Sequence, residues 1–402
     1  MLFAAISIAK TEKLCYNKKE EKEGILRIPS ERNRMLKLLH AADLHLCSPL
    51  AAFSPRVAAA RRKGQFSALE TLLTQAVGAG AQMILLAGDV FDTPTPPEDG
   101  VARLFGMLGA QPVPVLVAPG NHDRLLAGGV WNRADIPQNV YVFDSAQLTC
   151  FDFPTLRTAV YGYGFTAESM QAPNLGTPAD LLPDRVSVLL AHGDLLSPVS
   201  PYAPIGAGQL ERSGFDYVAL GHIHKPMPAR RYGHTVAAYS GFLMGRGFDE
   251  VGQGQALLVE IEGTHVGVTP LLCGADRFEI MELDCEGVTD GADIKARLQK
   301  RLTEAALPAG TALRVILTGQ VGADLRTDVP TLQAMGREFA LFEVRDRTVP
   351  VPNAAYLEKD PTLRGAFYRA LLPKLTSGDA EARALAAEAL RLGMAALLGR
   401  EV

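Results

Sequence analysis

Short apolar runs alternate with longer amphipathic segments between residues 35 and 118. Residues 36–41, 83–87 and 113–118 are apolar runs of strand length. Residues 66–77 and 101–108 instead place their apolar side chains on one helical face. This strand–helix–strand repeat predicts a largely buried sheet that is covered by helices.

Beyond residue 140 the apolar segments become mostly strand-like. They are too numerous for one small sheet, and a second sheet packed on the first would accommodate them. The predicted strands are residues 140–143, 186–190, 217–220, 235–239, 256–261 and 266–272.

The pattern changes again near residue 275 and divides the chain into four expected segments. We expect residues 1–34 to be a mobile, charge-rich extension, with Met35 as the natural start, and residues 35–274 to form the main domain. Residues 275–350 predict a small α/β cap, with strands at 278–283 and 313–318 and a helix at 293–306. Residues 351–402 follow a proline-rich stretch and predict two helices separated at residues 377–379.

Composition and charge exclude several protein classes. The 402 residues are 48% apolar and 21% charged, which is typical of globular proteins and excludes a disordered or collagenous chain. The five cysteines form no C-x-x-C pair, so neither a disulfide framework nor a cysteine zinc site is expected, and a cytoplasmic location fits. No apolar run approaches the roughly 18 to 20 residues of a membrane helix, so no membrane partner is expected. Because the net charge is −4, binding of a polyanion requires a local patch or a metal.

Five short segments concentrate side chains that can bind metals, and each directly follows a predicted strand. They contain five of the eight histidines. Because strand ends meet at one edge of an α/β sheet, we expect these segments to converge. They are residues 43–45 (Asp-Leu-His), 88–92 (Gly-Asp-Val-Phe-Asp), 120–123 (Gly-Asn-His-Asp), 192–194 (His-Gly-Asp) and 221–224 (Gly-His-Ile-His).

The ligand types indicate divalent metal ions. Imidazole, carboxylate and amide oxygen together suit manganese, iron or zinc, with magnesium as a further candidate. Two such ions about 3.5 to 4 Å apart can share a carboxylate, activate water and hold both reacting oxygens of a phosphoryl group. The predicted chemistry is therefore hydrolysis of a phosphoester with two divalent metal ions, of which Mn²⁺ is expected.

The order of these motifs resembles the calcineurin-like metallophosphoesterase superfamily, with its D-x-H, G-D-x-x-D, G-N-H-[DE], H and G-H-x-H elements. Residues 38–50 (LLHAADLHLCSPL) are similar to the first motif of SbcD-type DNA repair exonucleases, and more closely to their YhaO-like bacterial branch. Residues 240–262 also resemble the segment that closes the catalytic domain of those enzymes. The resemblance implies a four-layer α/β/β/α sandwich with a small α/β cap and C-terminal helices.

The same resemblance implies a role for each matching residue. Asp43, His45 and His224 would bind the first ion, Asn121, His192 and His222 the second, and Asp89 would bridge them. His122 would face the phosphate as a general acid or as an electrostatic stabiliser. Either Asp92 or Asp123 could hold the far ring nitrogen of His122, and the sequence does not choose between them.

Two interpretations stay open for several other polar residues. Arg246 could contact a substrate phosphate or belong to a surface hairpin turn. Residues 61–63 (Arg-Arg-Lys) could follow a DNA backbone, although a solvated helix face is favoured. Asp123 and Asp194 could be turn-stabilising residues or partners of the site, and His40 is expected to be a hydrogen-bonded core or supporting histidine.

The leading functional hypothesis is a DNA exonuclease or endonuclease acting in repair. The resemblance also implies a coiled-coil ATPase partner similar to SbcC, which would engage the C-terminal helices, and a homodimer. One alternative is a small-molecule or cyclic-nucleotide phosphodiesterase, which shares all five motifs. The other is a non-catalytic subunit that binds DNA ends and uses the metals for structure.

Overall fold

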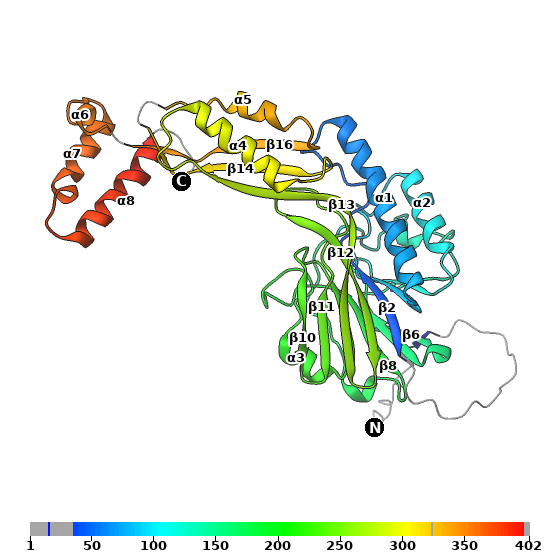
Figure 1. Cartoon of the computed structure of the whole chain (residues 1–402). Helices are drawn as coiled ribbons and strands as arrows, with labels where there is room; N and C mark the ends of the chain where they lie inside the picture. Colours follow the sequence, from blue (N-terminus) through cyan, green and yellow to red (C-terminus); the bar gives the residue numbers. More distant parts are fainter. Residues whose placement is uncertain (1–14, 17–34, 323–324, 352, 398–402) are drawn as a thin grey trace, which may run out of the picture. The chain divides into compact units, whose positions relative to one another are not determined.

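The computed structural model describes residues 15–16, 35–322, 325–351 and 353–397. Within these residues the chain divides into two compact units, Met1–Gly274 and Ala275–Val402, each described below by itself. Figure 1 shows their elements, coloured along the chain. Most of the predicted extension at residues 1–34 lies outside the described residues; within it, the two-residue strand β1 (Cys15–Tyr16) pairs in parallel with β6.

The first unit contains two sheets, and its first sheet follows the predicted repeat. The strand order in this unit is β13–β12–β2–β3–β4–β5, with β2, β3, β4 and β5 parallel and β12 antiparallel to β2. The bounds are β2 (Leu36–Ala41), β3 (Met83–Leu86), β4 (Val115–Val117), β5 (Val140–Val142), β12 (Gly252–Glu262) and β13 (His265–Asp284).

The second sheet has the strand order β1–β6–β7–β8–β9–β11–β10. Its strands β7, β8, β9 and β11 are parallel, whereas β6 pairs antiparallel with β7 and β10 pairs antiparallel with β11. The bounds are β6 (Thr149–Phe153), β7 (Thr158–Gly162), β8 (Val186–His192), β9 (Tyr217–Gly221), β10 (Met227–Tyr232) and β11 (Thr235–Tyr239).

Alternation along each strand builds the layers, because successive side chains point to opposite faces of a sheet. On β2, Leu39 packs towards α1 (Pro55–Gly78) and α2 (Glu98–Gly109), whereas Leu38 joins the core between the sheets. On β3, Ile84 and Leu85 divide in the same way. The outer face of the second sheet packs on α3 (Ala207–Ser213) and on the loops around it. The predicted α/β/β/α sandwich is therefore confirmed.

The second unit is a small α/β layer followed by a helical hairpin. Strands β13, β14 and β16 are parallel neighbours and share a core with α4. Helices α7 and α8 pack on each other through Tyr368, Leu390 and Met394. The bounds are α4 (Gly291–Ala305), β14 (Ala312–Thr318), β15 (Gln320–Val321), α5 (Val329–Gln333), β16 (Leu341–Asp346), β17 (Val349–Pro350), α6 (Ala354–Leu357), α7 (Leu363–Leu375) and α8 (Ala380–Leu397).

One expectation about strand boundaries is wrong. The sequence predicts separate strands at 266–272 and 278–283, but β13 continues through Gly274, which has a φ of +63°. The intervening residues are mostly polar or small, so the apolar pattern is interrupted. Backbone hydrogen bonding nevertheless continues, since β13 has β12 as its neighbour on one side and β14 on the other.

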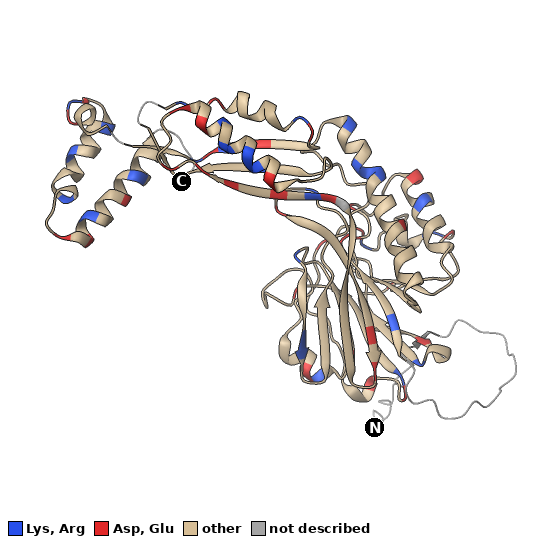
Figure 2. Ribbon diagram, viewed as in Figure 1, with Lys and Arg blue, Asp and Glu red and all other residues tan. Residues whose placement is uncertain are grey.

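Charge on the helices is mixed. In Figure 2 the basic residues of α4 lie beside acidic residues of the same helix, and Arg297 pairs with Asp293 as Lys300 does with Glu304. Such exposed pairs each contribute only a few tenths of a kcal/mol, about 0.3–0.5. Within the described part of the chain, no helix combines the length and apolar character that crossing a bilayer requires.

Candidate metal centre

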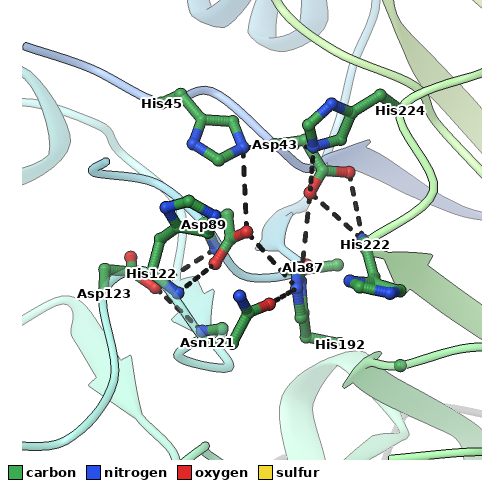
Figure 3. A network of polar contacts seen from close by, with 12 residues as sticks. Asp43, His45, Ala87, Asp89, Asn121, His122, Asp123, His192, His222 and His224 are labelled. Atoms are coloured by element: carbon green, nitrogen blue, oxygen red, sulfur yellow. Dashed lines mark hydrogen bonds and ion pairs between the residues drawn. The ribbon is translucent and has the colours of Figure 1, made fainter. Parts of the chain in front are cut away.

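The predicted ligands converge at the ends of strands from both sheets of the first unit. Asp43 and His45 follow β2, Asp89 follows β3, and Asn121 follows β4. The second sheet contributes His192 at the end of β8, and His222 and His224 after β9. Figure 3 shows these side chains pointing towards one another around Asp89. The fold thus brings together all seven residues that the sequence singles out as ligands.

The backbone at these strand ends is in an unusual conformation. Asp43, His45, Asp89 and His222 have positive φ values of 51°, 41°, 49° and 100°. Such conformations cost on the order of 1–3 kcal/mol each in residues other than glycine, and they persist only where surrounding contacts enforce them. Here the loops after β2 and β3 bind each other, because the amide of Asp43 donates to the carbonyl of Gly88 and that of His45 to Asp89. The site is therefore held by its own main chain.

One glycine is required for close approach of two loops. A Cβ on Gly120 would lie 2.6 Å from the backbone nitrogen of Asp89 and would also overlap its carboxylate. Real Cβ atoms essentially never come so close to a backbone atom. Only glycine therefore lets the loop after β4 pass beside Asp89.

The first group of ligands surrounds a position that a cation would fill. Asp43, His45, Asp89 and His224 each offer one ligand atom within 4.8 Å of the others. The Nε2 atoms of His45 and His224 lie 3.2 Å apart. In both rings Nδ1 faces a carboxylate, Asp92 at 2.9 Å for His45 and Glu250 at 2.8 Å for His224. In the neutral form of each ring with Nδ1–H donating there, both Nε2 atoms carry lone pairs that face one position, which a cation would fill.

The second group repeats this arrangement with a different partner. Nδ1 of His192 donates to the carbonyl of Ala87 at 3.0 Å, so its Nε2 is an acceptor. That Nε2 lies 3.0 Å from Oδ1 of Asn121, another acceptor, and 3.5 Å from Oδ2 of Asp89. The ring of His222 lies beside that of His192, with 5.3 Å between ring centroids. Two acceptors facing each other again indicate a cation position.

Asp89 lies between the two groups. Its Oδ2 is 3.7 Å from Nε2 of His45 and 3.5 Å from Nε2 of His192. The potential ligands are of three types: carboxylate, imidazole and amide. Together they fit two hard to borderline divalent ions that share the carboxylate of Asp89. The residues present therefore fit the predicted pair of metals.

The surroundings shift the pKa values of the ligands in different directions. Burial acts to lower the pKa of His224, but its hydrogen bond to Glu250 and the charges of Asp43 and Glu250 outweigh burial and raise that pKa. Burial lowers the pKa of both His45 and His222 to about 4, so both rings are neutral at pH 7. Burial raises the pKa of Asp43 to about 6. Burial also acts to raise the pKa of Asp89, but the charges of His192, His45 and His122 outweigh it and leave that pKa below its usual value.

His122 differs from its neighbours because its side chain is 43% exposed. Its amide donates to Oδ1 of Asp89 at 2.9 Å, which fixes the backbone beside the bridging carboxylate. Nδ1 donates to the backbone carbonyl of Asp92 at 3.3 Å and lies 3.7 Å from the Asp92 carboxylate. Nε2 is then the nitrogen available to a substrate.

The structure distinguishes the two carboxylates that could orient His122. Asp92 lies beside His122, whereas Asp123 is fully buried and accepts hydrogen bonds from the amides of Gly120 and Val90 and from Nε1 of Trp131. Asp123 therefore fastens the loop after β4 to the loop after β3. Burial, followed by the charge of Asp89, raises the pKa of Asp123 to about 6.

Arg246 is not part of a surface hairpin turn, since it lies in the long loop between β11 and β12. Its guanidinium binds Asp92 at 2.9 Å and Glu250 at 2.7 Å. A role in binding a substrate phosphate stays a prediction. Glu250 is the functional residue that sequence reasoning missed, and the only signal for it was its spacing of four residues from Arg246.

Contacts in the structure decide between the interpretations that the sequence leaves open for other polar residues. Asp194 accepts from the amides of Leu196 and Ser197 and is a turn-stabilising residue. The expectation of a solvated face at residues 61–63 is wrong for Arg61, which is buried and donates to the carbonyl of Gly245 at 3.1 Å. Arg61 and Gln65 are four residues apart, so they lie on the same side of α1, and both side chains are buried.

Comparison with families of known proteins matches residues 36–226 to the calcineurin-like phosphoesterases. These residues are therefore similar to the calcineurin-like phosphoesterases. All seven predicted ligands lie within the matched residues, whereas Arg246 and Glu250 lie beyond them. Over 240 residues, the chain is also 32% identical to a Bacillus subtilis (strain 168) protein described as "Uncharacterized metallophosphoesterase YhaO". That match covers 56% of this chain and 57% of the relative, so it spans little more than half of either protein.

Proposed function

We propose that this protein is a two-metal phosphodiesterase that hydrolyses phosphodiester bonds in DNA. The observation that carries the proposal is the pair of acceptor–acceptor contacts on either side of Asp89, His45 with His224 and His192 with Asn121. Each contact brings two potential ligand atoms together, and each lies within reach of the same carboxylate. The similarity to the calcineurin-like phosphoesterases supports hydrolysis of a phosphoester by such a centre.

The chain's own residues divide the work of the reaction. Bound in the two groups of ligands, divalent ions would supply Lewis-acid stabilisation of the phosphate and activation of water. The carboxylate of Asp89 lies between the two groups of ligands, and its Oδ1 also accepts a hydrogen bond that fixes the backbone of His122. As an imidazolium whose Nδ1–H is held by the carbonyl of Asp92, His122 would give the proton on Nε2 to the leaving oxygen and become neutral.

The choice of DNA as substrate rests on the sequence resemblance to SbcD-type exonucleases at residues 38–50 and 240–262. Both segments lie at the centre, since the first contains Asp43 and His45 and the second contains Arg246 and Glu250. A chain of net charge −4 needs such a cluster of cations to attract a polyanion. We take Mn²⁺ as the metal to test first, because the mixed oxygen and imidazole ligands suit it.

The test is cleavage of end-labelled linear duplex DNA by the full chain with Mn²⁺, Mg²⁺ or EDTA. We expect metal-dependent products from the wild type, none from Asp89→Ala, and at least a roughly 100-fold lower rate from His122→Ala. His234→Ala is a matched control, because this histidine is similarly exposed and pairs with Asp216 away from the metal centre.

Two outcomes would overturn the proposal in different ways. Hydrolysis of bis(p-nitrophenyl) phosphate without any DNA cleavage favours the small-molecule phosphodiesterase. Tight binding of DNA ends that stay intact with every divalent ion, without hydrolysis of either substrate, favours the non-catalytic subunit. Full activity of the His122→Ala variant would remove this residue from the mechanism and leave the metal centre standing.

A further inference from the structure

The loop between β11 and β12 contains an ion pair that lies beside the first group of ligands. The carboxylate of Glu250 is almost completely buried and accepts from the backbone amide of Arg246 at 2.7 Å. It also accepts from Nε and Nη2 of the same arginine, at 3.0 and 2.7 Å. Arginine and glutamate are therefore held together by three hydrogen bonds inside one short loop.

The same guanidinium reaches a second carboxylate across the site. Nη1 of Arg246 donates to Asp92 at 2.9 Å. Asp92 accepts from Nδ1 of His45, and Glu250 accepts from Nδ1 of His224. One arginine thus joins two carboxylates, and each carboxylate contacts one ligand imidazole. Nη2 of Arg246 also lies 3.3 Å from Nδ1 of His224, so the arginine contacts this ring directly as well. We name Arg246, Glu250 and Asp92 the clamp.

Helix α1 fixes the clamp and one of its histidines at the level of the main chain. Arg61 donates to the carbonyl of Gly245, directly before Arg246. Gln65, one helical turn later, donates to the carbonyl of His45 at 3.1 Å. Both side chains are buried, so the distance between the loop and the ligand is set by a rigid element.

The two groups of ligands differ in what holds their histidines. In the first group an ionised carboxylate accepts the Nδ1–H of both rings, whereas His192 in the second group donates to the neutral carbonyl of Ala87. A carboxylate partner fixes the orientation of an imidazole and makes it a more basic ligand than a carbonyl partner does. The difference between the groups is therefore chemical as well as geometric.

We propose that the clamp orients His45 and His224 and makes the first ion bind more tightly than the second. The inference rests on the proposed two-metal centre. Arg246 and Glu250 are positioning residues in this arrangement, since they act through the ligands and not on the substrate. The planar guanidinium matters because its fork must reach both carboxylates at once, which an ammonium group does not do in the same way.

The test is a titration of the metal-free full chain with Mn²⁺, in which electron paramagnetic resonance reports the free ion. We expect two ions per wild-type chain, one of them tighter. Glu250→Gln and Arg246→Lys should each weaken the tighter ion about 10- to 100-fold and leave the other unchanged. His222→Ala, which removes a ligand of the second group, should instead weaken the other ion.

A distant ion pair provides the matched control. Arg185 binds Asp152 through two hydrogen bonds, and their side chains are 23% and 14% exposed, compared with 22% for Arg246. Arg185→Lys should leave both Mn²⁺ affinities unchanged. Thermal unfolding in EDTA checks that each variant is folded, and Asp92→Asn replaces any clamp variant that is not.

The outcomes separate this inference from the proposed function. If every folded clamp variant binds Mn²⁺ with the same affinities as the wild type, the clamp is overturned. DNA cleavage by the wild type would still leave the proposed function standing. A wild type that binds two ions but cleaves no DNA overturns the function and leaves the clamp to be judged by the titration. A wild type that binds no Mn²⁺ overturns both. Recovery of variant activity at high Mn²⁺ with an unchanged kcat supports the clamp, because only the affinity for the ion has changed.

Discussion

His40 shows at the scale of one residue that a buried histidine near the centre need not be a ligand. Nδ1 accepts from the hydroxyl of Tyr217 at 2.8 Å, and Nε2 donates to the carbonyl of Leu220 at 3.1 Å. Both ring nitrogens are therefore occupied, unlike those of His45 and His192, where Nε2 faces another acceptor. The expectation of a hydrogen-bonded core histidine is confirmed.

The buried ring of His40 makes stability depend on pH. Burial lowers its pKa to about 3, whereas an unfolded chain titrates near 6.5. As the pH falls through this window the unfolded state takes up a proton that the folded state does not, so the free energy of unfolding decreases by at most about 1.4 kcal/mol per pH unit. Above pH 6.5 the effect is absent.

The prediction is tested by urea unfolding at pH 7, 6 and 5 in EDTA. His40→Gln should lose less stability than the wild type between pH 6.5 and 5, although its stability at pH 7 is lower. Subtracting the two curves removes the opposing contributions of Asp43 and Asp123. Parallel curves would show that His40 does not titrate as the structure implies.

At the scale of elements, the loops after the strands set the geometry of the centre. Asp123 ties the loop after β4 to the loop after β3, and Gly120 allows the two to touch. The strained backbone of Asp43 and Asp89 is maintained by hydrogen bonds between the loops after β2 and β3. Metal binding should therefore be sensitive to changes in loops that carry no ligand atom.

The Gly120→Ala substitution tests this dependence on the loops by adding a single methyl group. The added Cβ would displace Asp89, so we expect at least a roughly 10-fold loss of Mn²⁺ affinity and a lower free energy of unfolding. Gly106→Ala is the matched control, because a Cβ there meets nothing within 4 Å in the interior of α2. The control should be neutral or more stable by about 0.5–1 kcal/mol. Similar Mn²⁺ affinities for both variants would contradict the close approach.

Which elements the sequence predicts depends on how apolar they are. Buried strands such as β2 and β11 were predicted to the residue, because most of their side chains are apolar and only Lys37 and His40 interrupt β2. Strands β6, β7, β10 and β16 were missed. Strand β6 mixes polar and aromatic residues, β10 is largely exposed and β16 contains charged residues, whereas β7 is fully buried but only five residues long. Their place in the sheet depends on partners far away in the chain, which no local pattern contains.

The candidate site divides in the same way. The ligands could be predicted because each stands in a short motif directly after a strand. Glu250 could not, because it lies in an irregular loop and acts only through Arg246 and His224. The inward turn of Arg61 likewise depends on where the loop at Gly245 lies, and that position is set by tertiary structure.

At the scale of the whole molecule, metal binding should stabilise the first unit. Ions that bind only the folded state add about 2.7 kcal/mol each at 100 times their Kd. For a unit of this size we expect Mn²⁺ to raise Tm by several degrees, with about 2–4 °C for each kcal/mol. Thermal unfolding followed by circular dichroism in Mn²⁺ and in EDTA measures this shift.

The control for that shift is a chain with a damaged centre. His192→Ala should unfold at a similar temperature to the wild type in EDTA after allowance for the lost side chain, but should gain less from Mn²⁺. The same increase in Tm for both proteins would place the stabilising ions elsewhere in the chain.

We propose that the C-terminal hairpin of α7 and α8 binds a coiled-coil ATPase similar to SbcC, as the sequence resemblance implies. Leu385 is 72% exposed and Leu363 69% exposed, which leaves apolar side chains outside the hairpin core. Leu385→Glu should abolish co-purification with such an ATPase and leave Mn²⁺ binding unchanged, with Glu381→Gln on the same helix as the control. The homodimer rests on the resemblance alone, and light scattering of the purified chain tests it.

The wide spacing of the ligands along the chain also determines when the centre can exist. The amide of His222 binds the carboxylate of Asp43, 179 residues earlier in the sequence. During synthesis, a ribosome would release Asp43, His45, Asp89 and Asn121 well before the second sheet has been made. The second group of ligands is incomplete until His222 has left the exit tunnel, and the first group is incomplete until His224 has followed. A stalled or truncated chain that ends before His222 would therefore lack part of both groups and could not assemble the two-metal centre.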